Sequence, residues 1–467
     1  MTLIYGVKDK PKFSQVIVFA IQQLLAIMAA TLVVPVIING NISGMIAEGS
    51  LSWTLDKPMS STVALFGAGV GTLVYLLFTK FRSPVFLGSS FAFLGSMTAA
   101  FAGASSMALG YVGLILGAVC AGLVYVVIAI IVKFAGVKWI NKLMPAVVIG
   151  PTVTIIGLSL AGNAIGDLQT APAGGDSKVA LICGLVTLAV TIICSVYGKK
   201  MMKLIPFIMG ILAGYAVAAI FTVIGNAAGI DALKVINFSS FEALWADGIG
   251  LKTFITLPEF TFLNALGGFK EINGSYIATV AVAYVPVAFV VFAEHLADHK
   301  NISSIIESDL LEDPGLHRTL LGDGVGSMAG AIFGGCPNTT YGESVGCVAI
   351  TGNASVITIV TTAFAAIAIS FLSPFVAFVN SIPSCVMGGV CMALYGFIAV
   401  SGLKMVQKVD LEHNANLFTV SVILIAGIGG LTISFGQVSI TSIACALILG
   451  ILTNVLVNKS RKSDKLD

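Results

Sequence analysis

The stretch of sequence that decides the fold is CPNTTYGESVGCVAITG, which runs from Cys336 to Gly352. It lies between two apolar runs, yet it contains Pro337, Glu343 and several small polar residues. A plain lipid-facing helix cannot carry these residues, because irregular backbone at membrane depth is tolerated only where protein covers it or where it lines a cavity. A carboxylate beside such a break therefore indicates a functional site inside the membrane.

The composition indicates a polytopic membrane protein. Of the 467 residues, 57% are hydrophobic and only 10% are charged, with a mean hydropathy of +1.02, whereas soluble domains carry about 25% charged residues. The net charge of +2 and the scattered basic residues do not indicate a nucleic-acid partner. The eight cysteines lie in apolar stretches without a close CxxC pair, so we interpret them as core residues and predict no metal site.

Apolar runs long enough to span or half-span a bilayer recur along the whole chain. We predict fourteen segments, at residues 16–38, 61–79, 85–100, 107–132, 143–165, 179–197, 204–224, 277–296, 320–333, 336–350, 356–372, 383–400, 416–430 and 438–457. A loop of about 45 residues separates the first seven segments from the last seven, and we expect it to carry surface structure of its own. The predicted fold is all-α, with short broken third and tenth segments built as a strand plus a half-helix.

The distribution of basic residues predicts the orientation. With both termini inside, nineteen of the 24 Lys and Arg residues fall in inside loops and five in outside loops. This asymmetry agrees with the positive-inside rule. We therefore expect a multi-pass membrane protein whose termini are both cytoplasmic.

The two halves resemble each other. The fifth segment of the first half contains PAVVIG (Pro145–Gly150), and the fifth of the second half contains PSCVMG (Pro383–Gly388). The third segment of each half is the broken one. Because seven is odd, two such repeats have opposite orientations, and interrupted segments at corresponding positions of inverted repeats indicate a transporter's binding site.

Three acidic residues are expected at membrane depth: Glu294, Asp323 and Glu343. Asp298 follows Glu294 by four residues, so both carboxylates share one helix face, whereas His299 is rotated away by about 100° per residue step. Ionised carboxylates only accept hydrogen bonds. Two of them near one broken segment could hold a ligand that bears two N–H groups.

The breaks supply the complementary groups. Half-helices that begin near Phe91 and Glu343 expose unpaired backbone N–H groups that can donate to carbonyl oxygens of a ligand. The implied ligand is small, planar and polar, with alternating N–H and C=O groups. A nucleobase such as uracil or xanthine fits this description.

Several stretches resemble the nucleobase–ascorbate transporter (NCS2) family, and within it the bacterial uracil permeases. They span nearly the whole chain and are QQLLAIMAATLVVP, LGSSFAF, AEHLADH, DPGLHRTLLGDG, PNTTYGE and PSCVMGGVCMALYG. The family signature is met by Glu343, Gly346, Thr351 and Gly352, whereas Ser344 replaces the signature Asn.

The resemblance implies a 7+7 inverted repeat, a homodimer, and a core domain that moves against a gate domain. It also implies the bacterial cytoplasmic membrane, which is the inner membrane in a cell with two membranes. We expect core halves at residues 1–140 and 272–375, and gate halves at residues 141–271 and 376–467. It also implies a set of substrate contacts: the Glu294 and Glu343 side chains, the backbone at Phe91 and Gly342, and packing from Ala30, Tyr341 and Tyr395. Asp323, Ser344 and Asn338 would support these contacts from behind.

The proton is the expected coupling ion, and no other cofactor is expected. In similar uracil permeases a His follows the Glu of the eighth segment by four and assists proton coupling. Here that position is Asp298, with His299 one residue later, so we assign proton coupling to Glu294 together with Asp298 or His299. Neutralising the site would lower the electrostatic cost of moving it when it is loaded.

Each assignment has a structural alternative. Glu343 could cap broken backbone, and Glu294 could pair with a buried donor. Asp298 and His299 could be interfacial residues without a role, Asp323 could cap a helix, and the aromatic residues at the breaks could only pack.

The predicted function is proton-coupled uracil import by an elevator-type motion. A xanthine or other purine permease is the first alternative. An anion exchanger of the same architecture is a more remote one, because two acids at the site would repel an anion. The sequence has no HExxH, no GxSxG with partner residues and no metal-ligand cluster, so it does not indicate an enzyme.

Overall fold

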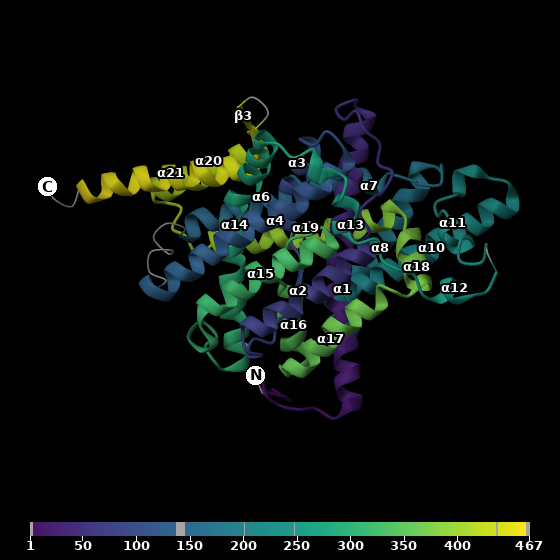
Figure 1. Ribbon diagram of the computed structural model, residues 1–467, viewed down its shortest axis with the longest axis horizontal. Helices are drawn as coiled ribbons and strands as arrows, with labels where there is room; N and C mark the ends of the chain where they lie inside the picture. Colours follow the sequence, from purple (N-terminus) through teal and green to yellow (C-terminus); the bar gives the residue numbers. More distant parts are fainter. Residues whose placement is uncertain (1–2, 137–144, 200, 247, 436–437, 464–467) are drawn as a thin grey trace.

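The computed structural model describes residues 3–136, 145–199, 201–246, 248–435 and 438–463, and it is mostly helical (Figure 1). Within these ranges, eight helices are long and apolar enough to cross a membrane. They are α1 (Phe13–Ala47), α2 (Ser61–Phe78), α4 (Met107–Ala135), α6 with α7 (Ala146–Ser159 and Ala161–Leu168), α8 (Ser177–Tyr197), α10 (Pro206–Ala228), α14 (Gly274–Ile306) and α19 (Ser384–Val406).

The remaining predicted segments fall on other elements. They are β1 (Leu87–Ser89), η1 (Phe91–Phe93), α3 (Leu94–Ala102), α15 (Leu316–Gly334), β2 (Asn338–Thr340), α16 (Gly342–Thr351), α17 (Val356–Ile369), α20 (Asn414–Ile428) and α21 (Ser442–Ser463). Each predicted apolar range overlaps a helix, and the third and tenth are broken into a strand and a short helix as expected. The start of the predicted fifth segment at Leu143 and the predicted domain boundary after residue 140 lie outside the described residues.

Several predicted segment boundaries were wrong; α1, for example, ends at Ala47 rather than residue 38, and α14 ends at Ile306 rather than residue 296. The last segment was expected to begin as a helix at Val438, but Val438–Ile440 is β4, which pairs with β3 (Ile433–Phe435) before α21 begins at Ser442. Apolar residues alternate with Ser434 and Ser439 in these strands, and an alternation of period two favours a strand. The eleventh segment ends at Ile369 rather than residue 372, and the separate helix α18 (Ser373–Ser381) follows it.

The loop after the seventh segment carries short helices, as predicted. They are η2 (Asp231–Leu233), α11 (Ser239–Glu242), α12 (Leu251–Phe254), α13 (Thr261–Ala265) and η3 (Gly268–Lys270); α9 (Met201–Leu204) and η4 (Leu311–Gly315) lie in other connections.

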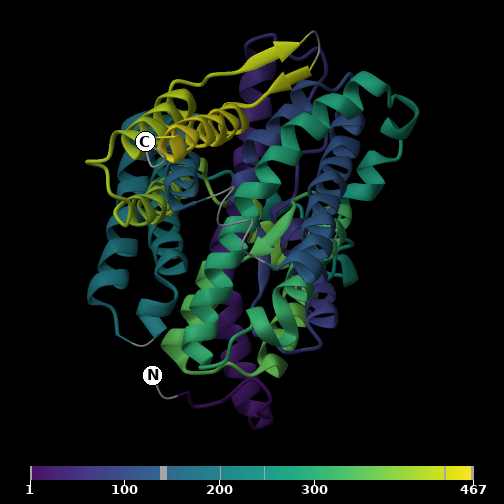
Figure 2. The same cartoon turned by 90° about the vertical axis from the view of Figure 1, so that its left-hand side faces the viewer.

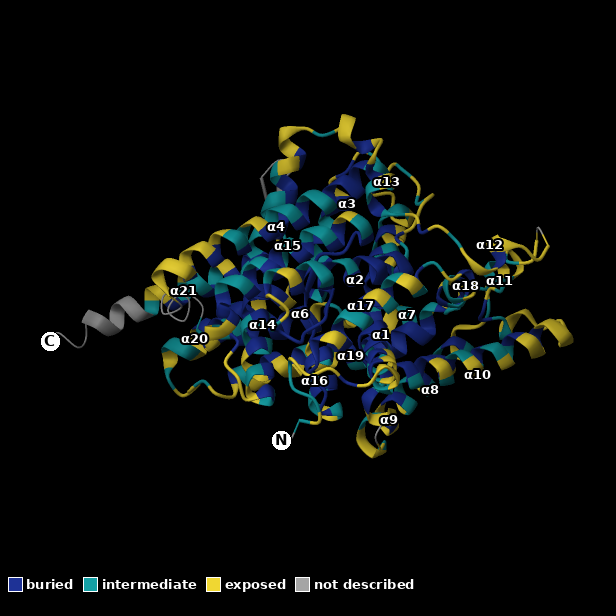
Figure 3. Ribbon diagram, turned by 60° about the horizontal axis from the view of Figure 1, so that its bottom comes forward, coloured by how far each residue is buried: buried dark blue, intermediate teal, exposed yellow. Residues whose placement is uncertain are grey.

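On α8 and α10, large apolar side chains such as Ile193 and Val223 are exposed (Figure 3). An apolar face of this kind suits contact with lipid.

The helices pack in two groups. In the first, α2 packs closely on α15, and α1, α3, α4, α14, α16 and α17 surround this pair. The close approach requires glycine, because a Cβ on Gly67 would collide with the carbonyl oxygen of Gly330, and one on Gly71 would lie 2.7 Å from the carbonyl oxygen of Gly326. These helices form the larger part of the buried core.

The second group consists of α6, α7, α8, α10, α19, α20 and α21. Most of it lies to the left of the purple α1 in Figure 2, whereas the blue helices α2 and α4 of the first group lie to the right. Helices α6 and α19 each begin directly after a proline, Pro145 and Pro383, and they pack on each other. The two groups meet where α1 contacts α10 and α19, and where α14 contacts α6 and α21.

Candidate functional site

The two broken segments meet in the middle of the first group. Strand β1 pairs antiparallel with β2, with Gly88 opposite Thr339, and each strand leads directly into a short helix. The N-terminal ends of η1–α3 and α16 are therefore held side by side. The first N–H groups of a helix have no partner within it, so both ends can donate to a ligand.

Small polar residues stabilise the strand crossing, which is the place where β1 pairs with β2. The Ser344 hydroxyl accepts hydrogen bonds from Nε2 of Gln23 (2.5 Å) and from the backbone N–H of Phe86 (2.9 Å). The Asn338 side chain donates to the carbonyl oxygen of Gly67 (3.1 Å). The first of these residues gives the buried backbone N–H of Phe86, which precedes β1, a partner outside any helix. Both residues were predicted to support the site; Ser344 is buried in α16 and Asn338 in β2, and neither lines the cavity described next.

A cavity of about 490 Å³ lies against the crossing. Its wall from the first group includes the predicted residues Glu294, Asp298, Phe91, Tyr341, Gly342 and Glu343. Its wall from the second group is mostly apolar and comes from α6, α10 and α19, with Val153, Phe207, Leu394, Phe397, Ile398, Ser401 and Met405. The cavity therefore lies between the two groups.

Three carboxylates reach this cavity. Glu294 and Asp298 lie one turn apart on α14, and Glu343 lies in the first turn of α16. The Thr340 hydroxyl donates a 2.8 Å hydrogen bond to Oδ2 of Asp298. A carboxylate in the first turn of a helix is stabilised by the helix dipole, and no Lys or Arg lies among the cavity-lining residues in the described ranges. The site therefore favours hydrogen-bond donors and cations over anions.

The two histidines of α14 point away from the cavity. His295 Nδ1 lies 2.7 Å from Oδ2 of Asp323, and its Nε2 lies 3.0 Å from the hydroxyl of Thr319. His299 Nε2 lies 2.7 Å from the hydroxyl of Tyr75, and its Nδ1 donates to the carbonyl oxygen of His295 (2.8 Å). Both imidazoles are fully buried. Of the two residues considered for proton coupling beside Glu294, the structure brings Asp298 to the cavity and does not bring His299.

Asp323 lies behind the cavity and is hydrogen-bonded to His295. Besides His295, its Oδ2 accepts a hydrogen bond from Thr339 of β2 at 3.5 Å. This chain of contacts connects α15 to α14 and to the strand crossing. It can hold the backbone that carries the cavity-lining groups, although Asp323 itself is not among the lining residues.

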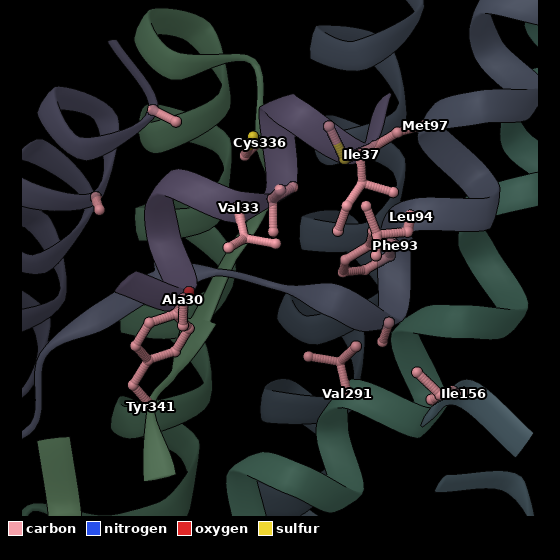
Figure 4. Close-up of a cluster of buried hydrophobic side chains, with 14 of the residues drawn as sticks. Ala30, Val33, Ile37, Phe93, Leu94, Met97, Ile156, Val291, Cys336 and Tyr341 are labelled. Carbon is pink, nitrogen blue, oxygen red and sulfur yellow. The ribbon is translucent and has the colours of Figure 1, made fainter. Parts of the chain in front are cut away.

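The remaining predicted contacts lie at the edge of the site. The Tyr341 hydroxyl donates to the carbonyl oxygen of Ser89 (2.8 Å), which fixes its ring across β1. Figure 4 shows Ala30 and Tyr341 in one buried apolar cluster. The ring of Tyr395 packs edge-on against Phe91, with centroids 6.1 Å apart. Ala30 and Tyr395 do not line the cavity itself.

Sequence reasoning missed the wall that the second group provides. Phe207 and Phe397 are apolar residues in apolar helices, and nothing local distinguishes them from lipid-facing residues. Asn301 also lines the cavity. It follows Glu294 by seven residues, a spacing that keeps both on one helix face, so this contact could have been found from the sequence.

Apolar membrane-crossing helices around an internal, acid-lined cavity define a multi-pass membrane protein with a buried binding site. The family model described as "Permease family" matches residues 14–435. The chain is 37% identical to the uracil permease of Bacillus caldolyticus, over 97% of this chain and 94% of that protein, and 35% identical to the uracil permease of Bacillus subtilis strain 168, over 98% and 96%. The chain belongs to this permease family, and it is a transporter rather than an enzyme.

Solved structures of other transporters share the fold. The transmembrane domain of the cyanobacterial bicarbonate transporter BicA matches with a TM-score of 0.59 and 14% identity, over 96% of this chain and 99% of that one. The murine anion transporter Slc26a9, in its inward-facing state, matches with a TM-score of 0.61 and 13% identity, over 97% and 69%. At these identities the similarity concerns the fold alone.

Proposed function

We propose that this permease imports uracil together with protons across the bacterial cytoplasmic membrane. The observation that carries the proposal is the meeting of Glu294, Glu343 and two half-helix N-termini at one cavity. Uracil has two N–H donors and two carbonyl acceptors on one small ring. Carboxylates match the donors and backbone N–H groups match the acceptors. Relatives that cover nearly the whole chain are named uracil permeases, which supports this choice of nucleobase.

Proton coupling follows from the charge of the cavity. Three carboxylates without a lining Lys or Arg make the empty site strongly acidic. A proton on Glu294 or Asp298 would reduce the cost of moving the site past apolar surroundings. Asp298 is the better candidate partner for Glu294, since it reaches the cavity whereas His299 is hydrogen-bonded to Tyr75 in the core.

The transport step we propose is a movement of the first group of helices, the core, against the second group, the gate. The core would comprise residues 1–140 and 272–375, and the gate residues 141–271 and 376–467. The packing of the long helices in two groups supports this division, whereas α13 and η3, within the gate range, pack on α4 of the core. It belongs to a fourteen-segment, 7+7 inverted-repeat architecture, with both termini cytoplasmic and two copies forming a homodimer.

The open side of the cavity supports an inward-facing state. Exposed Asn301 and Ser401 line its mouth, together with Met405. Met405 is next to Lys404 on α19, and the positive-inside rule assigns such loop-proximal lysines to the cytoplasm. In this state substrate would leave toward the cytoplasm.

Uptake of labelled uracil into proteoliposomes tests the proposal. The purified protein is reconstituted, and accumulation is measured with and without an inwardly directed proton gradient. We expect accumulation only with the gradient and little competition by excess xanthine. Strong competition by xanthine would favour a purine permease, and absence of uracil uptake with retained bicarbonate or sulfate transport would favour the anion-exchanger alternative.

A further inference from the structure

A second cavity, of about 360 Å³, lies between the same two groups of helices. One wall comes from α1, η1 and α3 of the first group and includes Asn41, Phe91 and Thr98. The other comes from α6, α7 and the residues around β4 and α21, and it includes Ser159 and Asn163. Phe91 lines this cavity and the acid-lined cavity alike. Its side chain therefore lies at the partition between them.

The two cavities lie at different depths along α6, since Val153 lines the acid-lined cavity and Ile156 and Ser159 line the second one. On α1, Asn41 lies near the C-terminal end, far from the lysines that precede Phe13. On α6–α7, Asn163 lies near the C-terminal end, and Lys138 and Lys142 precede the helix in the sequence. The positive-inside rule therefore assigns the second cavity to the outer side, whereas the acid-lined cavity opens on the other.

A chain of hydrogen bonds joins the two groups of helices at the second cavity. Nδ2 of Asn163 donates to Oδ1 of Asn41 at 2.7 Å, and Nδ2 of Asn41 donates to the hydroxyl of Thr98 at 3.1 Å. The second bond fixes the orientation of the Asn41 amide, so that its oxygen faces Asn163. The first bond joins α1 of one group directly to α7 of the other.

We propose that Asn41 and Asn163 form the outer gate of the transport pathway, with Phe91 as the partition beneath it. This inference rests on the core-against-gate movement proposed above and adds the contact that must break. For substrate to reach the carboxylates from outside, the two groups must part at this cavity. Parting them separates the two asparagines, so their bond selectively stabilises the state whose outer side is closed.

Residue Asn39 offers a matched control. Its Nδ2 donates to the carbonyl oxygen of Met59 (2.9 Å), and its Oδ1 accepts from the N–H of Met59 (2.8 Å). Met59 precedes α2, so both bonds stay within the core group. Asn39→Ala removes an amide of the same kind from the same helix, but it removes no contact between the groups.

The experiment measures which side of the protein is open. Single reporter cysteines are placed in each cavity, Ala99→Cys at a half-buried residue of the outer one and Ser401→Cys at an exposed residue of the inner one. The rates of labelling by a membrane-impermeant maleimide are compared in purified protein. Each reporter is combined with Asn163→Ala, Asn41→Ala or Asn39→Ala, and parent protein without a reporter corrects for the native cysteines.

We expect Asn163→Ala and Asn41→Ala to raise the ratio of outer to inner labelling about two- to tenfold, the range expected for one partly buried neutral hydrogen bond. The double variant should shift the ratio no further than either single variant. Asn39→Ala should leave it unchanged. An unchanged ratio in Asn163→Ala, or an equal shift in Asn39→Ala, would overturn the proposal. Labelling needs no uracil. A shifted ratio in a protein that does not transport uracil would therefore contradict the proposed substrate and still support the proposed gate.

Discussion

The hydroxyl of Thr340 donates a 2.8 Å hydrogen bond to Oδ2 of Asp298. This bond connects the strand of the tenth segment to the helix that also carries Glu294. It holds a second α14 carboxylate at the cavity, at the position where the family resemblance led us to expect a histidine. An aspartate is neutral when protonated, whereas a histidine is then a cation, so the site here can lose negative charge without gaining a positive one.

Replacing Asp298 by Asn tests its part in proton coupling. The amide keeps the size of the side chain and can still accept from Thr340, but it cannot take up a proton. We expect gradient-driven uracil accumulation to be lost, whereas exchange of labelled for unlabelled uracil across the vesicle membrane persists. Accumulation at the level of the unmodified protein would contradict the assignment. Glu312→Gln, at an exposed acid outside the cavity, is the control.

Replacing Glu343 or Glu294 by Gln tests the substrate contacts. A hydrogen bond to a charged group contributes about 1.5–3 kcal/mol, so each change should weaken uracil binding about ten- to hundredfold. Isothermal titration calorimetry in detergent gives the affinity, and size-exclusion chromatography shows whether the variant stays folded. High-affinity binding retained by either folded variant would remove that residue from the site.

Ser344→Ala should destabilise the protein without touching the ligand. The change leaves the Phe86 N–H and the Gln23 amide without their acceptor, and a buried unsatisfied polar group costs about 1–3 kcal/mol. Thermal unfolding in detergent measures the loss. Ser43→Ala, at an exposed position of α1, should change little. Equal melting temperatures for the two variants would show that the Ser344 hydroxyl does not support the crossing.

Gly67→Ala tests the close packing of α2 on α15. The added methyl group would collide with the Gly330 carbonyl oxygen, and overpacking of this kind costs about 1–3 kcal/mol. Gly44→Ala on α1 is the control, because an added Cβ there meets nothing within 4 Å. We expect the melting temperature to fall for the first variant and to hold or rise for the second. A Gly67→Ala protein as stable as the parent would mean that the helices separate without cost.

The sequence allowed the broken segments to be predicted because proline, glycine and acids interrupt apolar runs there. Glu294, Asp298 and Glu343 stand out for the same reason. The pairing of β1 with β2 could not be predicted, since it joins residues about 250 positions apart and depends on tertiary packing. The β3–β4 hairpin was missed although its alternation was visible in the sequence.

The cavity wall formed by α10 and α19 could not be predicted either. Phe207 and Phe397 face the site, but in a membrane protein an apolar residue suits lipid, core and cavity equally well. The direction of His299 was foreseeable only in part. A step of one residue turns a helical side chain by about 100°, so the sequence predicts that His299 points in another direction than Asp298. Its hydrogen-bond partner could not be predicted, because the hydroxyl of Tyr75 lies on α2, far away in the sequence.

The short ladder between β1 and β2 has a consequence for how a bound molecule is released. It fastens the two half-helices together, with Leu87 opposite Thr340 and Ser89 opposite Asn338. When one half-helix moves, the paired strands make the other move with it. A molecule bound to the N-terminal ends of both half-helices therefore keeps all of its hydrogen bonds to them during such a displacement. Release of the molecule then depends on when the apolar wall formed by α6, α10 and α19 moves away, and not on weaker hydrogen bonds to the half-helices.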